Sequence, residues 1–528
     1  MEVERDPWGK PYKVVIGKLR SCRSQQPTCP ELMLKIVATL FPQQVESSPV
    51  IKHASANTDI LPVTVEEVLK ACNKVDNNKA PGLDNIPNVA IKAAIRARPD
   101  LFIDLYNTCL EEGTFPKRWK VQQLVLLPKG QGQKPPDEPS SYRPICLLDT
   151  AGKILERLKC NGLEKALEDC GGLAQHQYGF RKARSTLDAI KIVVDSAKSA
   201  IARKRWKIGA KKYCAVVTLD VKNAFNSAKW SFIHQALAAF GVPTYIRRII
   251  GDYLNDRVLR YDTEEGYKKY RISGGVPKGS VLGPVLWNIM YDAVLRLQLP
   301  DEAKIVGFAD DIAVVVIAKF TEEVTRICNQ SVDIIRRWLL SVGLHLAEHK
   351  TEAVLISSRK LRENIKIRIG DQEITSQPVI RYLGVMIDDR LSFKQHIEYS
   401  SAKAAKVNGM ISRLMPNLRG PGEIRRRLLA GVVGSVMLYG APIWAEAVLI
   451  KDSARHLESV YRLSAIRVAS AFRTISLDAV CVIAGMCPLV ILATERSRRY
   501  FQKKEGKDIL RTEATDTWQI QWDQSEKG

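Results

Sequence analysis

Two apolar runs, residues 213–219 (YCAVVTL) and 305–318 (IVGFADDIAVVVIA), predict buried β-strands. Both are rich in β-branched residues, which favours strand over helix. Between them the pattern predicts an amphipathic helix near 230–240 and a glycine-rich loop, 273–280, that opens another helix. Asp310 and Asp311 interrupt the second run, so we expect a tight hairpin with these acids in its turn.

The flanking regions predict further helices and one hairpin. Residues 63–97 have a helical pattern with a capping box, Thr64 and Glu67, and the turn-rich stretch 79–84 interrupts it. Residues 119–129 predict a strand, which a Gly/Pro/polar loop (130–141) joins to a second extended piece in a flap-like hairpin. The pattern also predicts helices over 151–167 and 186–198, and a basic helical unit beyond residue 390. The fold class expected from the pattern is α+β.

The charge balance favours a polyanionic partner. The chain has 80 basic and 57 acidic residues, a net charge of +23. Such an excess attracts nucleic acid and makes binding strongly salt-dependent. Clustering of the basic residues favours a binding surface over evenly spread solvation; the clusters lie at 181–184, 203–205, 211–212, 425–427 and 498–499.

The eleven cysteines predict no zinc site, because none lies two to four residues from another. His345 and His349 are four residues apart but lack the glutamate placement of a zinc hydrolase helix. We expect reduced thiols in an intracellular protein without a signal peptide. The apolar stretch 428–450 could span a membrane by length, but Pro442 and Glu446 favour a buried, broken helix pair, so no membrane is expected.

Asp220 favours a functional role for Asp310 and Asp311, which would otherwise be explained as residues that form the turn. It ends the first apolar strand, and if the two strands are neighbours, all three carboxylates meet at one sheet edge. Oxygen donors on rigid strands suit Mg²⁺. Two such ions about 3.5–4 Å apart can activate a hydroxyl and stabilise a leaving pyrophosphate. The sequence thus predicts a two-metal site at Asp220, Asp310 and Asp311, with Mn²⁺ as an alternative ion.

Other residues have the chemistry that such a site needs. Lys129 and Arg143 flank the flexible connection of the flap and are candidates for binding a nucleoside triphosphate, with surface charges as the alternative. Gly279 would permit close approach of the backbone to a base or template strand; the alternative is a plain helix start.

Eight short motifs, in this order, resemble those of reverse transcriptases of the non-LTR (LINE-type) retrotransposons, most of all the arthropod elements that insert into ribosomal RNA genes. Together they cover roughly residues 60–390. The motifs are APGLD (80–84), SYRPI (141–145), YGFR (178–181), LDV (219–221), GVPKGS (275–280), FADD (308–311), GL leading to KT (343–344, 350–351) and YLG (382–384).

The resemblance implies a right-hand polymerase with an antiparallel palm sheet. It implies an N-terminal linker over 1–60, fingers and palm over 61–390, and a helical thumb and C-terminal region over 391–528. We expect a polymerase core without a nuclease domain or a cysteine/histidine knuckle.

The resemblance also implies a role for each matched position. Asp220, Asp310, Asp311 and the backbone of Val221 would bind the metals. Lys129, Arg143, Phe225 and Gly279 would bind the nucleotide, with Phe225 excluding a ribose 2′-hydroxyl unless it is simply a core aromatic. Lys350 would protonate pyrophosphate, with a solvated turn lysine as the alternative. Tyr382, Leu383 and Gly384 would hold the primer end, with an ordinary strand as the alternative.

The expected function is RNA-directed DNA polymerisation, with an RNA template, a DNA primer or target, and dNTPs as partners. The resemblance implies the nucleus as its location. The alternative is a catalytically silent relic that binds nucleic acid without incorporating nucleotides.

Overall fold

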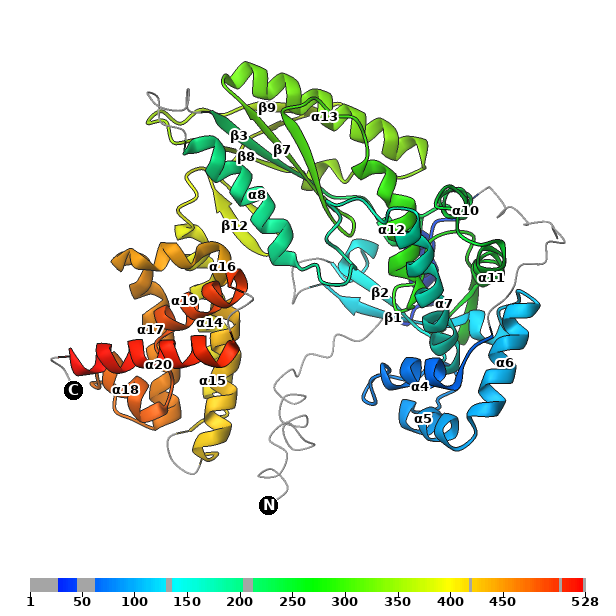
Figure 1. Ribbon diagram of the computed structural model, residues 1–528, viewed down its shortest axis with the longest axis horizontal. Coiled ribbons are helices and arrows are strands. Elements are labelled where there is room, and N and C mark those ends of the chain that lie inside the picture. Colours follow the sequence, from blue (N-terminus) through cyan, green and yellow to red (C-terminus); the bar gives the residue numbers. More distant parts are fainter. Residues whose placement is uncertain are drawn as a thin grey trace.

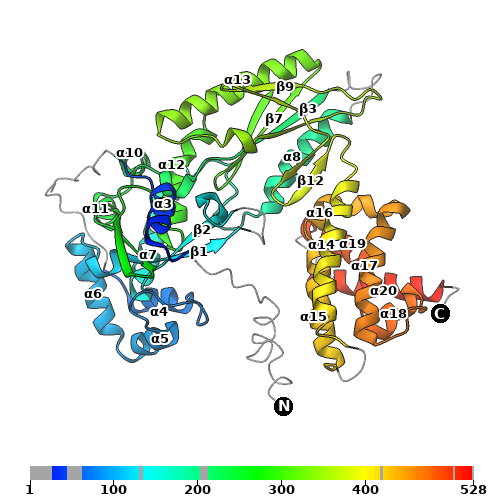
Figure 2. The same ribbon diagram turned by 180° about the vertical axis from the view of Figure 1, so that it is seen from behind.

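The computed structural model describes residues 27–44, 62–129, 135–202, 212–416, 420–502 and 506–525. Figures 1 and 2 show helices at the N-terminal side, two sheets in the middle, and a separate group of C-terminal helices. Residues 130–134 of the predicted flap loop and the basic clusters at 203–205 and Lys211 lie outside the described residues.

A four-stranded antiparallel sheet in the order β6-β7-β3-β8 lies at the centre. Its strands are β3 (Tyr213–Leu219), β6 (Ala303–Phe308), β7 (Asp311–Ala318) and β8 (Glu352–Ile356). Every neighbouring pair is antiparallel, so the expected antiparallel sheet is confirmed. The two apolar runs are strands, and β3 and β7 are direct neighbours.

Both faces of this sheet are covered by helices. Ala215 and Val217 of β3 pack in the core that includes α13 (Thr321–Ser341). Cys214 and Val216 point the other way, into the core that includes α8 (Thr186–Ile201). Burial on both sides explains why β3 reads as a continuous apolar run without alternation.

A second sheet has the order β2-β1-β4-β5. Strands β1 (Val121–Pro128) and β2 (Tyr142–Leu147) form the predicted antiparallel hairpin. Strand β4 (Val258–Thr263) adds parallel to β1, and β5 (Gly266–Arg271) pairs antiparallel with β4. The flap is therefore one edge of a mixed sheet.

Helices surround these sheets. The capping box at Thr64 and Glu67 is present at the start of α4, as predicted. These elements are α3 (Pro30–Leu40), α4 (Val65–Asn73), α5 (Asn88–Ala97), α6 (Pro99–Glu111), η1 (Lys117–Lys120), η2 (Pro139–Ser141), α7 (Thr150–Asp169), α9 (Ala224–Ser227), α10 (Trp230–Ala239), α11 (Thr244–Leu254), α12 (Leu282–Leu295) and η3 (Glu348–Lys350).

Helix α3 corrects the expectation that residues 1–60 are only a linker. Its residues Met33, Ile36 and Val37 are buried in the main core. The side-chain amides of Asn223 and Asn226 donate to the Leu40 carbonyl at 2.7 and 2.8 Å, which fixes the end of the helix. A helix of 11 residues gains its stability from this packing, so local pattern alone did not indicate it.

Beyond the central sheet the chain forms two small hairpins and a helical region. The hairpins are β9 (Lys366–Ile369) with β10 (Gln372–Thr375), and β11 (Val379–Tyr382) with β12 (Val385–Asp388). The helices are α14 (Lys394–Ser412), α15 (Glu423–Met437), α16 (Ala441–Trp444), η4 (Ala445–Leu449), α17 (Lys451–Ala469), α18 (Leu477–Ala484), α19 (Leu489–Phe501) and α20 (Lys507–Asp523).

The apolar stretch 428–450 is a broken helix pair, as predicted. Gly440, with φ 72°, separates α15 from α16, and Trp444 at the end of α16 is fully buried. Within the described ranges, no single helix is long and apolar enough to cross a membrane. Two pairs of helices, each bent at a short break, are long and apolar enough by length and composition. They are residues 423–437 with 441–449, and residues 477–484 with 489–501.

Candidate active site

The three predicted carboxylates lie at one edge of the central sheet. Leu219 of β3 is opposite Ile312 of β7, so Asp220 comes directly after one strand where Asp311 begins the other. Asp310 lies in the β6–β7 turn beside Ala309, whose φ is 58°. The expected convergence of the three acids is confirmed by this pairing, and their catalytic roles stay a prediction.

Burial and repulsion between neighbouring charges raise the pKa values of Asp310 and Asp311. The pKa of Asp311 is raised to about 7, first by desolvation and then by the charges of Asp310 and Asp220, while Lys350 acts in the opposite direction. Desolvation is also the main cause that raises the pKa of Asp310. Asp311 keeps an exposed surface, which leaves a path for a cation to reach it.

This repulsion predicts a stability effect in metal-free protein. The Asp311 pKa rises from an ordinary value of 3.8 to about 7 on folding, so the ionised carboxylate destabilises the fold increasingly between pH 4 and 7. Asp311→Asn removes that penalty. In EDTA, we expect it to be more stable than wild type at pH 8 by about 1 kcal/mol, given the partial exposure of the group.

Thermal melts at pH 4.5 and pH 8 measure this effect. The difference in melting temperature between Asp311→Asn and wild type should be small at pH 4.5 and largest at pH 8. Asp100→Asn is the control, because Arg98 lowers the pKa of that carboxyl. Equal melting temperatures of Asp311→Asn and wild type at pH 8 would show that the three carboxylates do not repel one another.

Lys350, to which the resemblance gives a role, lies beside the acids. It ends η3, and its Nζ lies 2.6 Å from Oδ2 of Asp220. The backbone N–H of Ala347 donates to the Asp220 carbonyl at 2.8 Å, which ties this loop to the end of β3. The lysine is half-exposed, and its ammonium group partly neutralises the carboxylate cluster.

The donor set fits a hard divalent cation in its chemistry. Carboxylate oxygens are what Mg²⁺ prefers, and a cation would relieve the repulsion among them. In the part of the chain that the structure describes, no three His, Cys, Asp or Glu side chains form a ready metal cluster. Asp220 would therefore have to exchange Lys350 for the ion. Val221, the predicted backbone ligand, forms a bridge with Leu346 directly after Asp220.

The flap carries Lys129 and Arg143 on adjacent strands. The Lys129 N–H donates to the Ser141 carbonyl at 2.7 Å, and Arg143 lies opposite Leu127 two positions away. Arg143 is exposed and lowers the pKa of Lys278, a lysine that Asp310 and Asp220 also influence. Lys278 is therefore close enough to interact electrostatically both with Arg143 of the flap and with the carboxylates at the edge of the central sheet.

Lys278 is a site residue to which sequence reasoning gave no role. Desolvation lowers the pKa of its ammonium group, and Asp310 raises it. Its Nζ lies 5.7 Å from the ring centroid of Phe225. The signal was present in the GVPKGS motif, where Lys278 precedes the glycine that was singled out.

Phe225 is a core residue that contacts other aromatic rings. Its ring stacks on Trp287 at 5.1 Å and meets the exposed Phe180 edge-on at 5.8 Å. Trp287 in turn stacks on Tyr291, whose hydroxyl donates to the Asp310 carbonyl at 3.5 Å. Phe225 is 8% exposed and belongs to the main core, which agrees with the core interpretation, and its role in excluding a 2′-hydroxyl stays a prediction.

Gly279 makes a close approach, but the structure shows it against protein. Its φ is +131°, and a Cβ there would lie 2.3 Å from the carbonyl oxygen of Cys146 in β2. The Cys146 N–H donates to the Lys278 carbonyl at 2.8 Å. Gly279 therefore allows the loop to lie directly on the flap, and an approach to nucleic acid stays a prediction.

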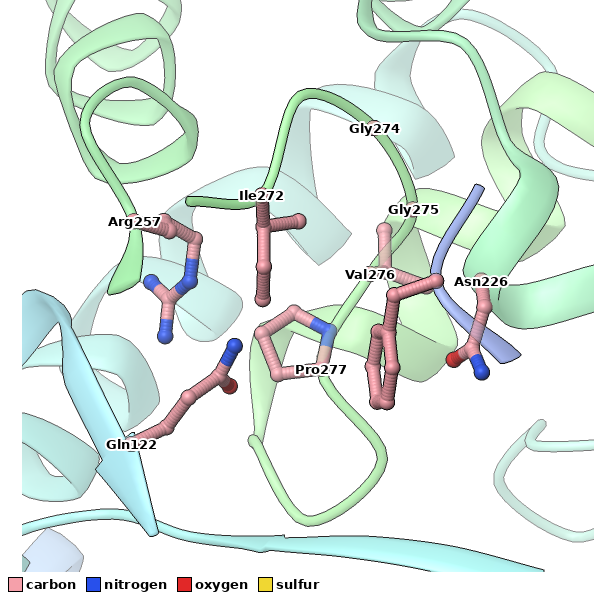
Figure 3. A pocket seen from close by; sticks show the side chains of 9 residues that line it. Gln122, Asn226, Arg257, Ile272, Gly274, Gly275, Val276 and Pro277 are labelled. Atoms are coloured by element: carbon pink, nitrogen blue, oxygen red, sulfur yellow. The ribbon is translucent and has the colours of Figure 1, made fainter. Parts of the chain in front are cut away.

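Buried polar groups also hold the GVPKGS loop (275–280) and the start of α12 in place. Glu156 of α7 is buried and accepts from the N–H groups of Val281 and Leu282 at 2.6 and 3.1 Å, where α12 begins. Figure 3 shows Gln122 pointing toward Pro277, and Gln122, Arg257 and Pro277 all line a cavity of about 10 Å³. A cavity of that size holds about one water, which the polar groups around it could bind.

Tyr382 ends β11, and Leu383 and Gly384 form the turn between β11 and β12. Leu383 and Gly384 have positive φ, 45° and 87°, as a tight hairpin requires. Tyr382 is buried, and desolvation followed by the charge of Asp311 raises the pKa of its phenol. The Tyr439 hydroxyl donates to the Leu383 carbonyl at 2.8 Å, so the C-terminal helices hold this hairpin.

The fold and its acid edge agree with one class of protein, the reverse transcriptases. Residues 128–387, just under half of the chain, match the family model "Reverse transcriptase (RNA-dependent DNA polymerase)". The relatives that the chain resembles include R1 elements, which are non-LTR retrotransposons. The chain is 28% identical over 94% of its length to the "Putative 115 kDa protein in type-1 retrotransposable element R1DM" of Drosophila melanogaster.

Two further relatives agree. The "Retrovirus-related Pol polyprotein from type-1 retrotransposable element R1" of Bradysia coprophila is 25% identical over the whole of this chain. The "RNA-directed DNA polymerase from mobile element jockey" of Drosophila melanogaster is 27% identical over 73% of it, and this match covers 42% of the jockey protein. The chain spans about half the length of the R1 relatives, 48% and 54%.

A solved telomerase from Candida albicans aligns with 81% of this chain and 69% of its own, at 12% identity and a TM-score of 0.33. A similarity this weak carries no weight for the fold, which rests on the strand pairing.

Proposed function

We propose that the chain is the RNA-directed DNA polymerase of a non-LTR retrotransposon, extending a DNA primer on an RNA template. The observation that carries this proposal is the meeting of Asp220, Asp310 and Asp311 at the β3–β7 edge, inside the region that matches the family. The net charge of +23 supports nucleic acid as the partner.

Each site residue has a proposed task. The three carboxylates and the Val221 carbonyl would hold two Mg²⁺ ions, and such ions would supply activation of a 3′-hydroxyl and stabilisation of a leaving pyrophosphate. Lys129, Arg143 and Lys278 bind the triphosphate of the dNTP, and Gly279 keeps the loop against the flap. Lys350 gives a proton to the pyrophosphate oxygen. The turn Tyr382–Gly384 holds the primer end.

A primer-extension assay tests the function. Purified protein with Mg²⁺, dNTPs and a DNA primer annealed to RNA should add nucleotides, and replacing Mg²⁺ with EDTA should stop it. Mn²⁺ is the second ion to try. Salt-sensitive RNA binding without any incorporation would overturn the proposal and favour the silent relic.

The second prediction concerns sugar selection by Phe225. We expect Phe225→Val to raise ribonucleotide use relative to dNTP use by roughly 10- to 100-fold, because the smaller side chain leaves room for a 2′-hydroxyl. The ratio of kcat/KM for rUTP and dTTP on one primed RNA measures this.

Phe115→Val is the matched control for that variant. It removes the same atoms from another buried aromatic, so it costs a similar few kcal/mol of stability, and it should leave the ratio unchanged. If both variants show the wild-type ratio, Phe225 is only a core residue.

We also propose the division into fingers and palm over 61–390 and a thumb and C-terminal region over 391–528. Nuclear location of the parent protein is a further proposal. Microscopy of a fluorescently tagged chain in arthropod cells tests it, and a signal confined to the cytoplasm would contradict it.

A further inference from the structure

Residues 176–179 form a short extension of the central sheet beside β6. The Gly307 N–H donates to the His176 carbonyl at 2.9 Å, and the Tyr178 N–H donates to the Gly307 carbonyl at 2.8 Å. Gln177 forms a parallel bridge with Gly307. The segment therefore lies one strand away from the turn that carries Asp310.

The Gln177 side chain reaches from this segment to the acid turn. It is completely buried, and its Oε1 accepts from the N–H of Ala309 at 3.1 Å and from the N–H of Gly179 at 3.0 Å. Because the N–H groups of Ala309 and Gly179 both donate, the Gln177 side chain must face them with its amide oxygen and not with its NH₂ group. Ala309 has φ 58° and directly precedes Asp310.

Steric contacts hold the same arrangement. A Cβ on Gly179 would lie 2.1 Å from the Ala309 nitrogen, so only glycine lets the segment lie this close to the turn. On the other side, Asn288 of α12 donates to the Gly179 carbonyl at 2.9 Å. The segment is thus held between the acid turn and the helix that follows the GVPKGS loop.

We infer that Gln177 is a positioning residue that fixes the Ala309–Asp310–Asp311 turn in the geometry needed for metal binding. Ala309 is in a backbone conformation that a non-glycine residue rarely adopts, and the bond to Gln177 satisfies its buried N–H. Small displacements of a catalytic group have large effects on rate. The inference rests on the proposed polymerase function.

The test compares Gln177→Met with wild type. Methionine keeps the length and apolar shape of the side chain but accepts neither N–H strongly. It also removes the Gln177 Nε2 group, which is buried without a hydrogen-bond partner. That removal offsets only part of the cost of leaving the Ala309 and Gly179 N–H groups unpaired, so the variant should fold but melt at a lower temperature. We expect kcat per active site, counted from the pre-steady-state burst, to fall roughly 10- to 100-fold while the KM for dNTP stays within about twofold. Binding of Mn²⁺, followed by electron paramagnetic resonance, should weaken severalfold.

Gln175→Met is the matched control, because Gln175 is exposed in the same segment. It should have the wild-type kcat and Mn²⁺ affinity. A Gln177→Met protein with wild-type kcat per active site and Mn²⁺ affinity would overturn the inference, whatever its melting temperature. If wild type itself extends no primer, the proposed function fails, while the Mn²⁺ comparison still decides the role of Gln177.

Discussion

Asp310→Asn should reduce primer extension by at least about a thousandfold, to the background of the assay. Asparagine keeps the shape of the turn but loses the negative charge that a metal ion needs. The variant should still bind primed RNA, because the basic surface is unchanged, and it should fold, because the Asp310 carboxyl is destabilised by burial in the wild-type protein. Steady-state extension and a filter-binding assay at the same salt concentration measure the two properties.

Asp371→Asn is the control that separates metal binding from turn formation. Asp371 follows Gly370 in the two-residue turn between β9 and β10, just as Asp310 follows Ala309 between β6 and β7. The control should keep wild-type activity. Extension by Asp310→Asn at more than a few per cent of the wild-type rate would eliminate the proposed site and leave Asp310 as a turn former.

Gly279→Ala is expected to have the next largest effect, a loss of activity of roughly a hundredfold. Its new Cβ would lie 2.3 Å from the Cys146 carbonyl oxygen, and φ +131° is strained for any side chain. The loop must then move away from the flap, and it takes Lys278 with it. Single-turnover kinetics at rising dNTP concentration should show weaker nucleotide binding together with a slower step.

Gly266→Ala is the control that separates backbone strain at positive φ from the steric clash of a new Cβ with the flap. Gly266 also has positive φ, 107°, but open space surrounds the position of a Cβ. It lies at the turn of β4 and β5, so the alanine variant should lose some stability and keep its activity. Equal losses of activity in the two variants would show that contact between the loop and the flap does not matter.

Local pattern was sufficient for most of the secondary structure near the site. Strands β3 and β7 could be predicted because burial on both faces makes them continuous apolar runs, and the acids could be placed because they end those runs. The flap hairpin and the capping box at Thr64 followed from short-range signals. Helix α3 did not, because its 11 residues gain their stability from packing in the main core and from the bonds of Asn223 and Asn226 to the Leu40 carbonyl.

Site residues that act through long-range contacts could not be predicted from the sequence. Gln177 and Ala309 are 132 positions apart, and Glu156 and Leu282 are 126 apart. In the sequence, Gln177 is an ordinary polar residue before the YGFR motif, and Glu156 is one acid in a helix. Their burial and their hydrogen bonds exist only after the central sheet and α12 have packed.

The sequence by itself determined the chemistry: which acids end the strands, how basic the chain is, and which family its motifs resemble. The tertiary structure decided how these groups face one another. It paired β3 with β7 so that the carboxylates repel, joined Lys350 to Asp220, and held the Asp310 turn with Gln177. The physical reason is that strand pairing fixes register between distant segments, and neither distances nor pKa values exist before that register is set.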